Sequence, residues 1–174
     1  VATLGDGNAY GLRITYSPEP AGALETAGGI AAALPLLGDR AFLAINGDVW
    51  CDWDFAAAPR LADTLDPQSA HLVLVDNPSH HPGGDFCLAG NIVRYAASDS
   101  EHTLTYAGIG IFRPDFFAAV QVGVAMKLRP LLDHGIARGL IRGERHSGRW
   151  VDVGTPQRLA ELDLELRDRE LKNT

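Results

Sequence analysis

Short apolar runs alternate with helical stretches along most of this 174-residue chain. The runs at 41–45 and 71–75 are mainly apolar, as in strands that are buried on both faces of a sheet. An alanine-rich helix is expected at 25–36, and a second helix at 55–65. Because a strand, a crossover helix and another strand form the unit of parallel sheets, the pattern predicts an α/β fold with a mostly parallel central sheet flanked by helices.

The remaining elements are expected from the same signals. Prolines and glycines between 78 and 84 mark a loop, and two short alternating pieces at 86–88 and 92–95 predict a small antiparallel insertion. Further strands are expected at 11–16, 104–112 and 149–153, and further helices from Pro114, at 128–140 and from Pro156 to about 172. The sequence thus predicts a Rossmann-like sheet in a single domain over residues 1–174.

Composition excludes several classes of partner. The formal net charge is −7 and no run of Lys or Arg occurs that could neutralise successive phosphates, so we expect no nucleic-acid partner. The apolar stretches are far shorter than a bilayer requires, so no membrane partner is expected. Cys51 and Cys87 are the two cysteines, and their spacing fits neither a zinc site nor a disulfide framework. Reduced thiols in the cytoplasm are the simplest interpretation.

Asp48 is the first candidate metal ligand. It ends the motif Asn46-Gly47-Asp48, which directly follows the apolar run at 41–45. Ligands of open parallel sheets bind outside the carboxyl ends of the strands, where a flexible Gly would let a carboxylate face them. Asn, Gly and Asp are also the commonest turn residues, so a plain turn capped by Asp48 is an equal alternative.

Asp152 lies in a second motif of this style, Trp-Val-Asp-Val-Gly-Thr-Pro at 150–156, where Gly-Thr-Pro forms the turn into a helix. Two aspartates at strand ends, far apart in the sequence, would converge on one Mg²⁺, which prefers one or two carboxylates together with phosphates and water. Alternatively, Asp152 would be a structural residue that accepts hydrogen bonds from backbone N–H groups.

The entry to the helix at 25–36 carries a third candidate site, Leu24-Glu25-Thr26-Ala27-Gly28-Gly29. Paired glycines would let a base or a phosphate approach backbone N–H groups at a helix N-terminus, where Glu25 could accept hydrogen bonds. Glycines beside alanines are at least as typical of close helix packing, so both interpretations stay open.

Two further patterns near residue 80 are set aside. Gly83-Gly84-Asp85-Phe86 begins like the GGDEF motif of signalling cyclases, but the second acidic residue is absent and the flanking segment is rich in proline. His80 and His81 are adjacent and would point to different sides, so a solvated loop is expected there and not a pair of metal ligands.

Taken together and in this order, the motifs resemble those of bacterial sugar-1-phosphate nucleotidyltransferases, and within that family the N-acetylmuramate-1-phosphate uridylyltransferases, which are often grouped with mannose-1-phosphate guanylyltransferase-like proteins. The resemblance covers essentially all 174 residues. Its anchors are Tyr-Ser-Pro-Glu at 16–19, Leu-Glu-Thr-Ala-Gly-Gly at 24–29, Asn-Gly-Asp-Val-Trp at 46–50, Leu-Val-Leu-Val-Asp-Asn-Pro at 72–78, Gly-Asp-Phe at 84–86 and Trp-Val-Asp-Val-Gly-Thr at 150–155.

The resemblance implies transfer of a nucleotidyl group from an NTP to a sugar 1-phosphate, giving an NDP-sugar and pyrophosphate. Asp48 and Asp152 would be the catalytic pair that holds Mg²⁺. The nucleotide would be bound by Glu25, Thr26, Gly28 and Gly29, and the sugar phosphate by Gly84, Asp85, Gly108 and Lys127. Positioning and charge neutralisation would supply most of the catalysis, so no Ser, Cys or His nucleophile is needed.

One departure from the family pattern bears on activity. Members begin with a strand, a loop of the type GxGxRxxPLT and a downstream Pro-Lys-Pro, which hold the triphosphate, and the sequence given contains neither motif. We therefore expect a domain that is incomplete at its N-terminus and impaired or inactive alone, because losing even one such contact costs about 10²–10³ in rate. Exposed sheet surface would also favour a homodimer or low solubility.

Three alternatives stay open at this point. UTP with N-acetylmuramic acid 1-phosphate is favoured, and GTP with mannose 1-phosphate is the alternative within the family. A non-catalytic subunit that binds a nucleotide sugar would keep the fold without the triphosphate loop. A metal-dependent glycosyltransferase is suggested by Asp52 and Asp54, which crowd Asp48 much as the carboxylates of a DxD motif do.

Overall fold

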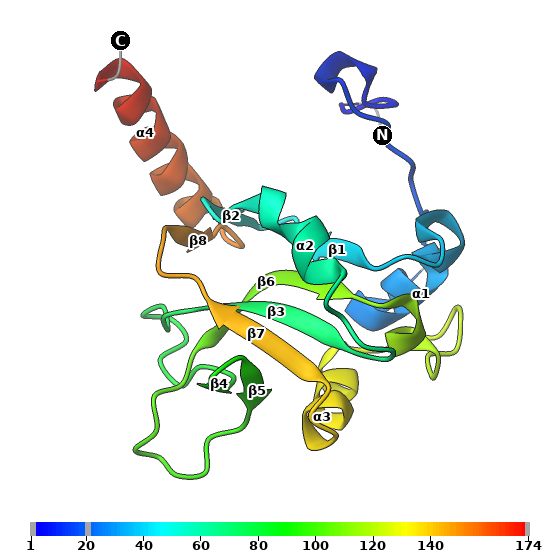
Figure 1. The fold of residues 1–174 in the computed structure, drawn as a ribbon. Coiled ribbons are helices and arrows are strands. Elements are labelled where there is room, and N and C mark those ends of the chain that lie inside the picture. Colours follow the sequence, from blue (N-terminus) through cyan, green and yellow to red (C-terminus); the bar gives the residue numbers. More distant parts are fainter. Residues whose placement is uncertain (1–2, 20–21, 173–174) are drawn as a thin grey trace.

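The computed structural model describes residues 3–19 and 22–172, and these form a six-stranded sheet beside a small two-stranded sheet (Figure 1). The large sheet has the strand order β1-β6-β3-β7-β5-β4. Its strands are β1 (Phe42–Ile45), β3 (Ala70–Val75), β4 (Cys87–Ala89), β5 (Ile92–Arg94), β6 (Thr105–Phe112) and β7 (Ile141–Arg145). The small sheet pairs β2 (Val49–Cys51) with β8 (Trp150–Asp152).

The large sheet is mixed. Strands β3 and β7 pair in parallel, whereas β6 lies antiparallel between β1 and β3, so β1, β3 and β7 run in one direction. At the far edge, β4 and β5 form the antiparallel hairpin expected from the sequence. The α/β class and the small antiparallel insertion are confirmed. Strands β1, β3 and β7 run parallel to one another, as the expected parallel sheet requires. However, β1 and β3 are not hydrogen-bonded neighbours, because the antiparallel strand β6 lies between them.

Helices cover both faces of the large sheet. The α-helices are α1 (Glu25–Leu37), α2 (Ala58–Ala62), α3 (Arg129–Ala137) and α4 (Pro156–Lys172), and the 3-10 helices are η1 (Asn8–Tyr10), η2 (Phe55–Ala57) and η3 (Pro114–Phe117). Side chains on a strand alternate between faces, so Leu72 and Leu74 pack with α1, η3 and α3, while Val73 and Val75 pack with Trp53 and α2. Burial on both faces explains the nearly continuous apolar sequence of β3.

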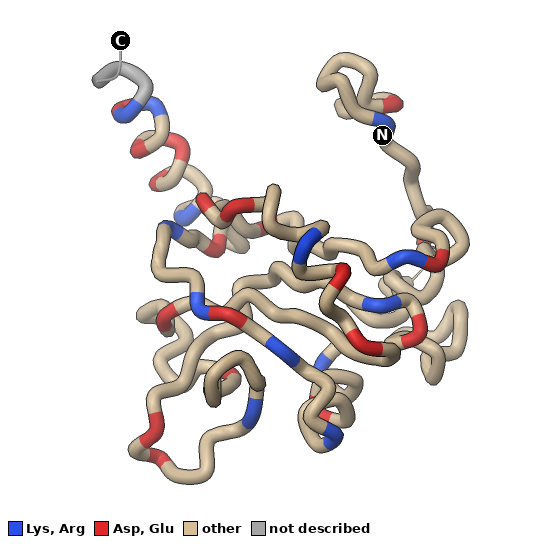
Figure 2. The backbone as a smooth tube through the Cα atoms, in the orientation of Figure 1, with Lys and Arg blue, Asp and Glu red and all other residues tan. Residues whose placement is uncertain are grey.

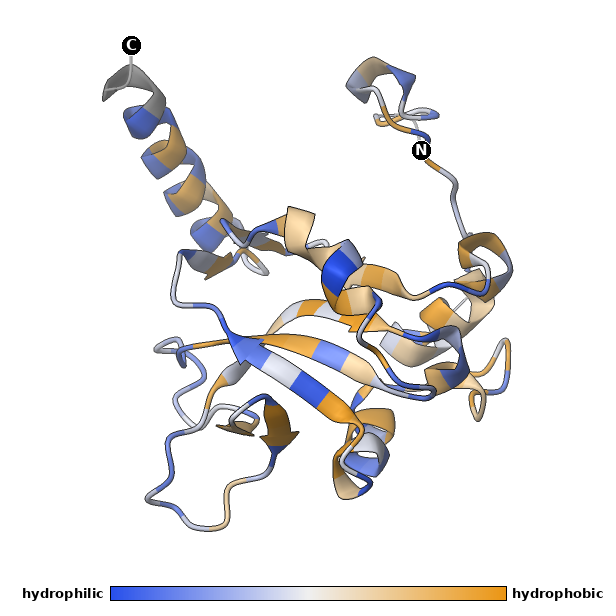
Figure 3. Cartoon of the chain, viewed as in Figure 1, coloured by the Kyte–Doolittle hydropathy of each residue, from blue (hydrophilic) through white to orange (hydrophobic). Residues whose placement is uncertain are grey.

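Two segments project from this body (Figure 1). Residues 3–19 contain η1 and otherwise no helix or strand, so the strand expected at 11–16 is wrong. At the other end, α4 extends from the small sheet, and orange and blue residues alternate along it in Figure 3. Acidic and basic residues also alternate along α4 (Figure 2), where Arg167 pairs with Asp163 and Arg169 with Glu165. No described helix is long and apolar enough to cross a membrane.

The other differences from the expected elements have local causes. Strand β7 was not expected, because its sequence Ile-Arg-Gly-Glu-Arg lacks the apolar pattern, yet it pairs along its whole length with β3. The helix expected at 128–140 ends at Ala137, and Gly139 adopts φ +68° in the turn that follows. The helix expected at 55–65 is a 3-10 turn followed by the short α2. The expected helices at 25–36 and 156–172 are confirmed.

Candidate active site

The small sheet brings Asp48 and Asp152 together. Val49 lies opposite Asp152 in the β2–β8 pair, and Val153 donates its backbone N–H to the carbonyl oxygen of Asp48 at 2.8 Å. A methyl group added to Gly154 would lie 2.9 Å from Asp152 Oδ1 and 3.5 Å from Asp48 Oδ2. One carboxylate oxygen of each aspartate therefore lies close to the Cβ position of Gly154, although 103 residues lie between the two aspartates in the chain.

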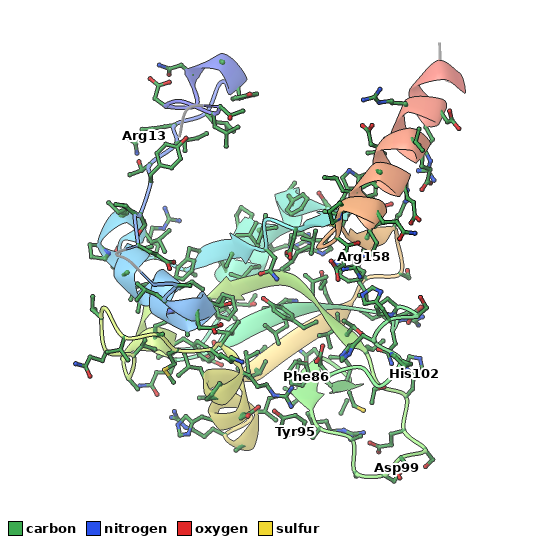
Figure 4. All side chains as sticks on the ribbon, turned by 180° about the vertical axis from the view of Figure 1, so that it is seen from behind. Arg13, Phe86, Tyr95, Asp99, His102 and Arg158 are labelled. Carbon is green, nitrogen blue, oxygen red and sulfur yellow. The ribbon has the colours of Figure 1, made fainter. Side chains whose placement is uncertain are left out.

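Asp152 is the more heavily bonded of the two carboxylates. Its Oδ1 accepts a hydrogen bond from the Gly154 backbone N–H at 2.7 Å and lies 3.3 Å from the guanidinium of Arg158. Its Oδ2 lies 3.2 Å from His80 Nε2. Arg158 comes from the first turns of α4, so this helix and the loop that follows β3 both reach the aspartate pair (Figure 4 labels Arg158). The histidine loop is thus part of the site and not merely a solvated segment.

The aspartate pair fits Mg²⁺ as a cofactor. Within residues 3–19 and 22–172, no group of three or more His, Cys, Asp or Glu side chains is arranged to hold a metal ion by itself. Magnesium is commonly held by one or two carboxylates while phosphates and water complete its octahedron. Two converging carboxylates beside an open cavity match that preference better than they match the full protein cages of zinc or calcium sites.

A cavity of about 320 Å³, here called the aspartate cavity, opens in front of this pair. Its lining combines the two aspartates with the histidine loop, the first half of β6 and the first residue of β8. The lining residues are Asn46, Asp48, Val49, Pro78, His80, His81, Thr105, Tyr106, Ala107, Gly108, Trp150 and Asp152. Trp150 is held in this wall because its indole N–H donates to the carbonyl oxygen of Ala107 at 2.9 Å.

Gly108 has a clear structural reason to be glycine. Its φ is +73°, and a Cβ at this position would lie 2.8 Å from Asn46 Nδ2. Asn46 also donates its backbone N–H to the carbonyl oxygen of Gly108 at 2.8 Å. Other residues rarely adopt this conformation, and the missing side chain lets Asn46 pack directly against β6 in the wall of the aspartate cavity.

A second cavity of about 390 Å³, here called the α3 cavity, lies beside the first. Asn46 and Tyr106 line both, so the two cavities adjoin, and together they are here called the groove. The α3 cavity lies between the start of α1 and the start of α3, and it is lined by Glu25, Thr26, Asn46, Asp85, Phe86, Tyr106, Lys127, Leu128, Arg129 and Leu132. The α1 wall is unusual, since Glu25 has φ +59° at the first position of the helix, a region that a non-glycine residue rarely adopts.

The structure places most of the predicted site residues along this groove. Asp48, Asp152 and Gly108 line the aspartate cavity, while Glu25, Thr26, Asp85 and Lys127 line the α3 cavity. Asp85 is bonded on both oxygens, since Oδ2 accepts from the Tyr106 backbone N–H at 2.9 Å and Oδ1 lies 3.3 Å from His81 Nε2. It thereby fixes the loop at 77–85 against β6.

Three predicted glycines lie outside the lining of both cavities. A Cβ on Gly28 would lie 2.5 Å from the Val124 carbonyl oxygen, and the Gly28 N–H donates to Met126, so this glycine permits close packing of α1. A Cβ on Gly29 would lie 2.8 Å from Glu19 Oε1, and one on Gly84 would lie 2.5 Å from Asn77 Oδ1. These positions shape the walls of the groove and do not face it.

The structure separates Asp52 and Asp54 from the aspartate cavity. Asp52 Oδ1 accepts from the Arg149 backbone N–H at 2.7 Å and lies 2.8 Å from His146 Nε2. Desolvation of the carboxylate acts to raise the pKa of Asp52, but these hydrogen bonds outweigh it and lower the pKa. Asp54 caps η2 by accepting from the Ala56 N–H at 3.1 Å. Neither carboxylate lines the groove, so they do not form a DxD motif with Asp48.

A larger cavity of about 550 Å³ lies elsewhere, under the edge strand β1 and α2. Its charged lining residues are Asp39, Arg40, Asp63 and Arg113, two of each sign, and none of the predicted site residues borders it. Volume alone therefore does not identify the site. The aspartate cavity is the better candidate because two carboxylates converge there.

Comparison with known proteins identifies the family. Over 159 residues the chain is 50% identical to an N-acetylmuramate alpha-1-phosphate uridylyltransferase of Neisseria meningitidis, covering 91% of this chain and 69% of that protein. It belongs to the sugar-1-phosphate nucleotidyltransferase family. A protein of the same name from Caulobacter vibrioides is 34% identical over 162 residues, covering 89% of this chain and 66% of that protein. The chain thus spans about two thirds of the length of these relatives.

Solved structures support the fold of this nucleotidyltransferase. A Bacillus anthracis protein named as a glucose-1-phosphate thymidylyltransferase superposes with a TM-score of 0.78 at 17% identity, over 96% of this chain and 70% of that one. HddC from Yersinia pseudotuberculosis superposes with a TM-score of 0.60, also at 17% identity, over 82% and 62%. No protein-family model matches the chain.

Several residues of the groove were missed by the sequence analysis. Asn46, Tyr106, Trp150 and His80 line the aspartate cavity, and Arg129 lines the α3 cavity. Asn46 and Trp150 lay inside quoted motifs, so proximity to Asp48 and Asp152 was an available signal. Tyr106 and Arg129 lie two positions from the candidates Gly108 and Lys127, but their place in the groove depends on how β6 and α3 pack against the rest of the fold.

Proposed function

We propose that this nucleotidyltransferase transfers a uridylyl group from UTP to N-acetylmuramic acid 1-phosphate, giving UDP-N-acetylmuramic acid and pyrophosphate. The observation that carries the proposal is the convergence of two carboxylates in a cavity that adjoins a second one. The 50% identity to the Neisseria meningitidis uridylyltransferase supports this base and this sugar over GTP and mannose 1-phosphate.

Asp48 and Asp152 are proposed to hold Mg²⁺ in the aspartate cavity, where the metal would neutralise charge on the reacting phosphates. Gly154 leaves room for both carboxylates, and its N–H fixes the orientation of Asp152 through the hydrogen bond to Oδ1. The phosphate oxygen of the sugar attacks the α-phosphorus in line, so the protein orients two substrates and needs no nucleophile of its own.

The remaining site residues are assigned by their place along the groove. Glu25 and Thr26 would bind the nucleotide from the start of α1, and Gly28 and Gly29 would let α1 pack closely enough to present them. Gly108, Asp85 and Lys127 would face the sugar phosphate from β6, the loop at 77–85 and the approach to α3, with Gly84 shaping that loop. These roles follow from the positions that the matching motifs occupy.

The cellular setting is part of the same proposal. The product would serve recycling of the bacterial cell wall in the cytoplasm, where UTP is present, and the catalytic unit would be a single domain. Association into a homodimer is a further proposal, which light scattering of the purified protein would test.

The test is pyrophosphate release by the complete gene product, with residues 1–174 assayed in parallel. UTP and GTP are each combined with the 1-phosphates of N-acetylmuramic acid, glucose and mannose in the presence of Mg²⁺. We expect turnover with UTP and N-acetylmuramic acid 1-phosphate, and lower or no activity for residues 1–174 alone. Turnover of another pair corrects the substrates. No turnover of any pair, together with binding of an intact NDP-sugar, would contradict the catalytic proposal and favour a nucleotide-sugar-binding subunit.

A further inference from the structure

Two cations line the α3 cavity. Lys127 and Arg129 flank Leu128 at the start of α3, and neither lines the aspartate cavity. The helix dipole does not favour this position, because cations are disfavoured beside the first turn of a helix. Arg129 is nevertheless held there by an i,i+4 ion pair with Asp133.

Arg129 is held in a fixed orientation by three neighbours. Its guanidinium carbon lies 5.2 Å from the ring centroids of both Phe86 and Tyr95, and its Nε donates to Asp133 Oδ1 at 2.7 Å. Tyr95 also donates its hydroxyl to Asp133, so Asp133 accepts hydrogen bonds from both Arg129 and Tyr95. Figure 4 shows Phe86 and Tyr95 on neighbouring segments beside α3, and their ring centroids lie 5.7 Å apart.

These contacts with Phe86, Tyr95 and Asp133 leave Arg129 able to bind an anion. The ion pair with Asp133 engages Nε, and the Arg129 side chain is half exposed where it lines the cavity, so its Nη groups are accessible to an acceptor there. Two acidic residues also line the α3 cavity. Asp85 has both oxygens engaged by Tyr106 and His81, and Glu25 belongs to the α1 wall and not to the α3 wall that carries Arg129. A cation that is ordered before the ligand arrives loses less freedom on binding, and Arg matches the two oxygens of a carboxylate in a bidentate pair.

The substrates of the proposed reaction offer one anion for this position. The phosphates of UTP and of the sugar must meet at the carboxylates of Asp48 and Asp152, where the bond is made. The remaining negative charge is the carboxylate of the lactyl ether on the muramic acid ring, which glucose, mannose and N-acetylglucosamine lack. A carboxylate projecting from the sugar would lie away from the reacting phosphorus.

We propose that Arg129 binds the lactyl carboxylate of the sugar substrate and so selects N-acetylmuramic acid 1-phosphate over neutral hexose 1-phosphates. The inference rests on the proposed function and adds the residue that determines its sugar specificity. Lys127, which is exposed, keeps the role toward the sugar phosphate proposed above, whereas Arg129 supplies the bidentate geometry that a carboxylate requires.

The test compares N-acetylmuramic acid 1-phosphate with N-acetylglucosamine 1-phosphate, which differs only by the missing lactyl ether. In the complete gene product, Arg129→Gln should raise KM for the muramic substrate by about 10- to 100-fold, with a smaller change in kcat and an unchanged KM for the glucosamine substrate. Arg129→Lys should restore part of the preference. Arg138→Gln is the matched control, because Arg138 follows the other end of α3 and pairs with Gln68 outside the groove.

Two outcomes would overturn the inference. An equal rise in KM for both sugars would show a structural role of Arg129, and unchanged KM values would show no role. Calorimetric titration with the same two sugar phosphates gives a readout that does not depend on turnover. A wild-type preference for the muramic compound that disappears in Arg129→Gln supports the inference even where no turnover occurs, and the absence of any wild-type preference refutes it.

Discussion

The two sheets of this protein are built in different ways. In the six-stranded sheet, β3 is buried at every position and β6 at all but one, and phenylalanine rings pack against them. In the two-stranded sheet, every residue of β2 and β8 is only half-buried. The strand that carries Asp152 and the turn that carries Asp48 therefore belong to the less buried sheet.

This difference separates stability from activity. The large sheet is stabilised mainly by burial of apolar area, which is insensitive to small polar changes at the surface. The small sheet is positioned by hydrogen bonds, such as Asp52 with Arg149 and His146, and Trp53 Nε1 with Glu144 at 2.7 Å. Changes in the large sheet should therefore alter unfolding, and polar changes around the small sheet should alter catalysis.

The largest expected effect on folding follows removal of a core ring. Phe112 is fully buried, and its ring centroid lies 6.2, 5.6 and 5.5 Å from those of Phe42, Phe116 and Phe117. Phe112→Ala should lower the free energy of unfolding by about 3–5 kcal/mol, whereas Trp50→Ala in β2 should cost clearly less, because that site is half-buried. Urea denaturation measures both. Equal losses would contradict the distinction between the sheets.

Gly108→Ala tests the point where the large sheet meets the groove. The positive φ and the overlap of the new Cβ with Asn46 should lower the free energy of unfolding by about 1–3 kcal/mol. Displacement of Asn46 should also lower kcat. Gly110→Ala is a poor control because it too is crowded, so Gly90→Ala is preferred, since a methyl group there meets open space although φ is also positive. Loss of activity in both variants to the same extent would show that backbone strain alone is responsible.

Asp52→Asn tests the polar support of the small sheet. The neutral amide keeps the shape of the side chain but weakens the contacts with His146 and the Arg149 N–H. We expect kcat to fall by about tenfold, equivalent to about 1.4 kcal/mol, with little change in thermal stability. The matched control is Asp54→Asn, which only caps η2. A loss of stability without a change in kcat would show that Asp52 is not needed to position the aspartate pair.

The smallest effect is expected at the polar edge of the large sheet, where Arg94 of β5 pairs with Glu101 at 2.7 Å. The hydrogen bond from Arg94 lowers the pKa of Glu101 to about 2. A carboxylate whose pKa is lower in the folded state than in the unfolded state stabilises the fold at pH values above its unfolded-state pKa. For Glu101 this stabilisation is lost as the pH falls from about 4.5 to about 2. Wild type should thus exceed Glu101→Gln in Tm at pH 7, and the difference should shrink by pH 3. A constant difference would indicate a non-ionic role.

Sequence patterns were sufficient for the buried elements and for the proximity of Asp48 and Asp152, because apolar periodicity and strand-end motifs are local. They were insufficient for β7, because its charged residues Arg142, Glu144 and Arg145 interrupt the apolar pattern by which a strand is predicted. They were also insufficient for Tyr106 and Arg129, which reach the groove only through tertiary packing. The glycine pair at 28 and 29 was left between two interpretations, and the contact of Gly28 with Val124 supports close packing.

The most direct test of the account is the Mg²⁺ dependence of pyrophosphate release by the complete gene product carrying Asp48→Asn or Asp152→Asn, with Asp54→Asn as control. If the two carboxylates hold the metal together, each variant should lose about 10²–10³ or more in rate and require more Mg²⁺, while keeping the thermal stability of wild type. Asp54→Asn should stay within about twofold of wild type. Wild-type rates and Mg²⁺ dependence in either site variant would contradict the account.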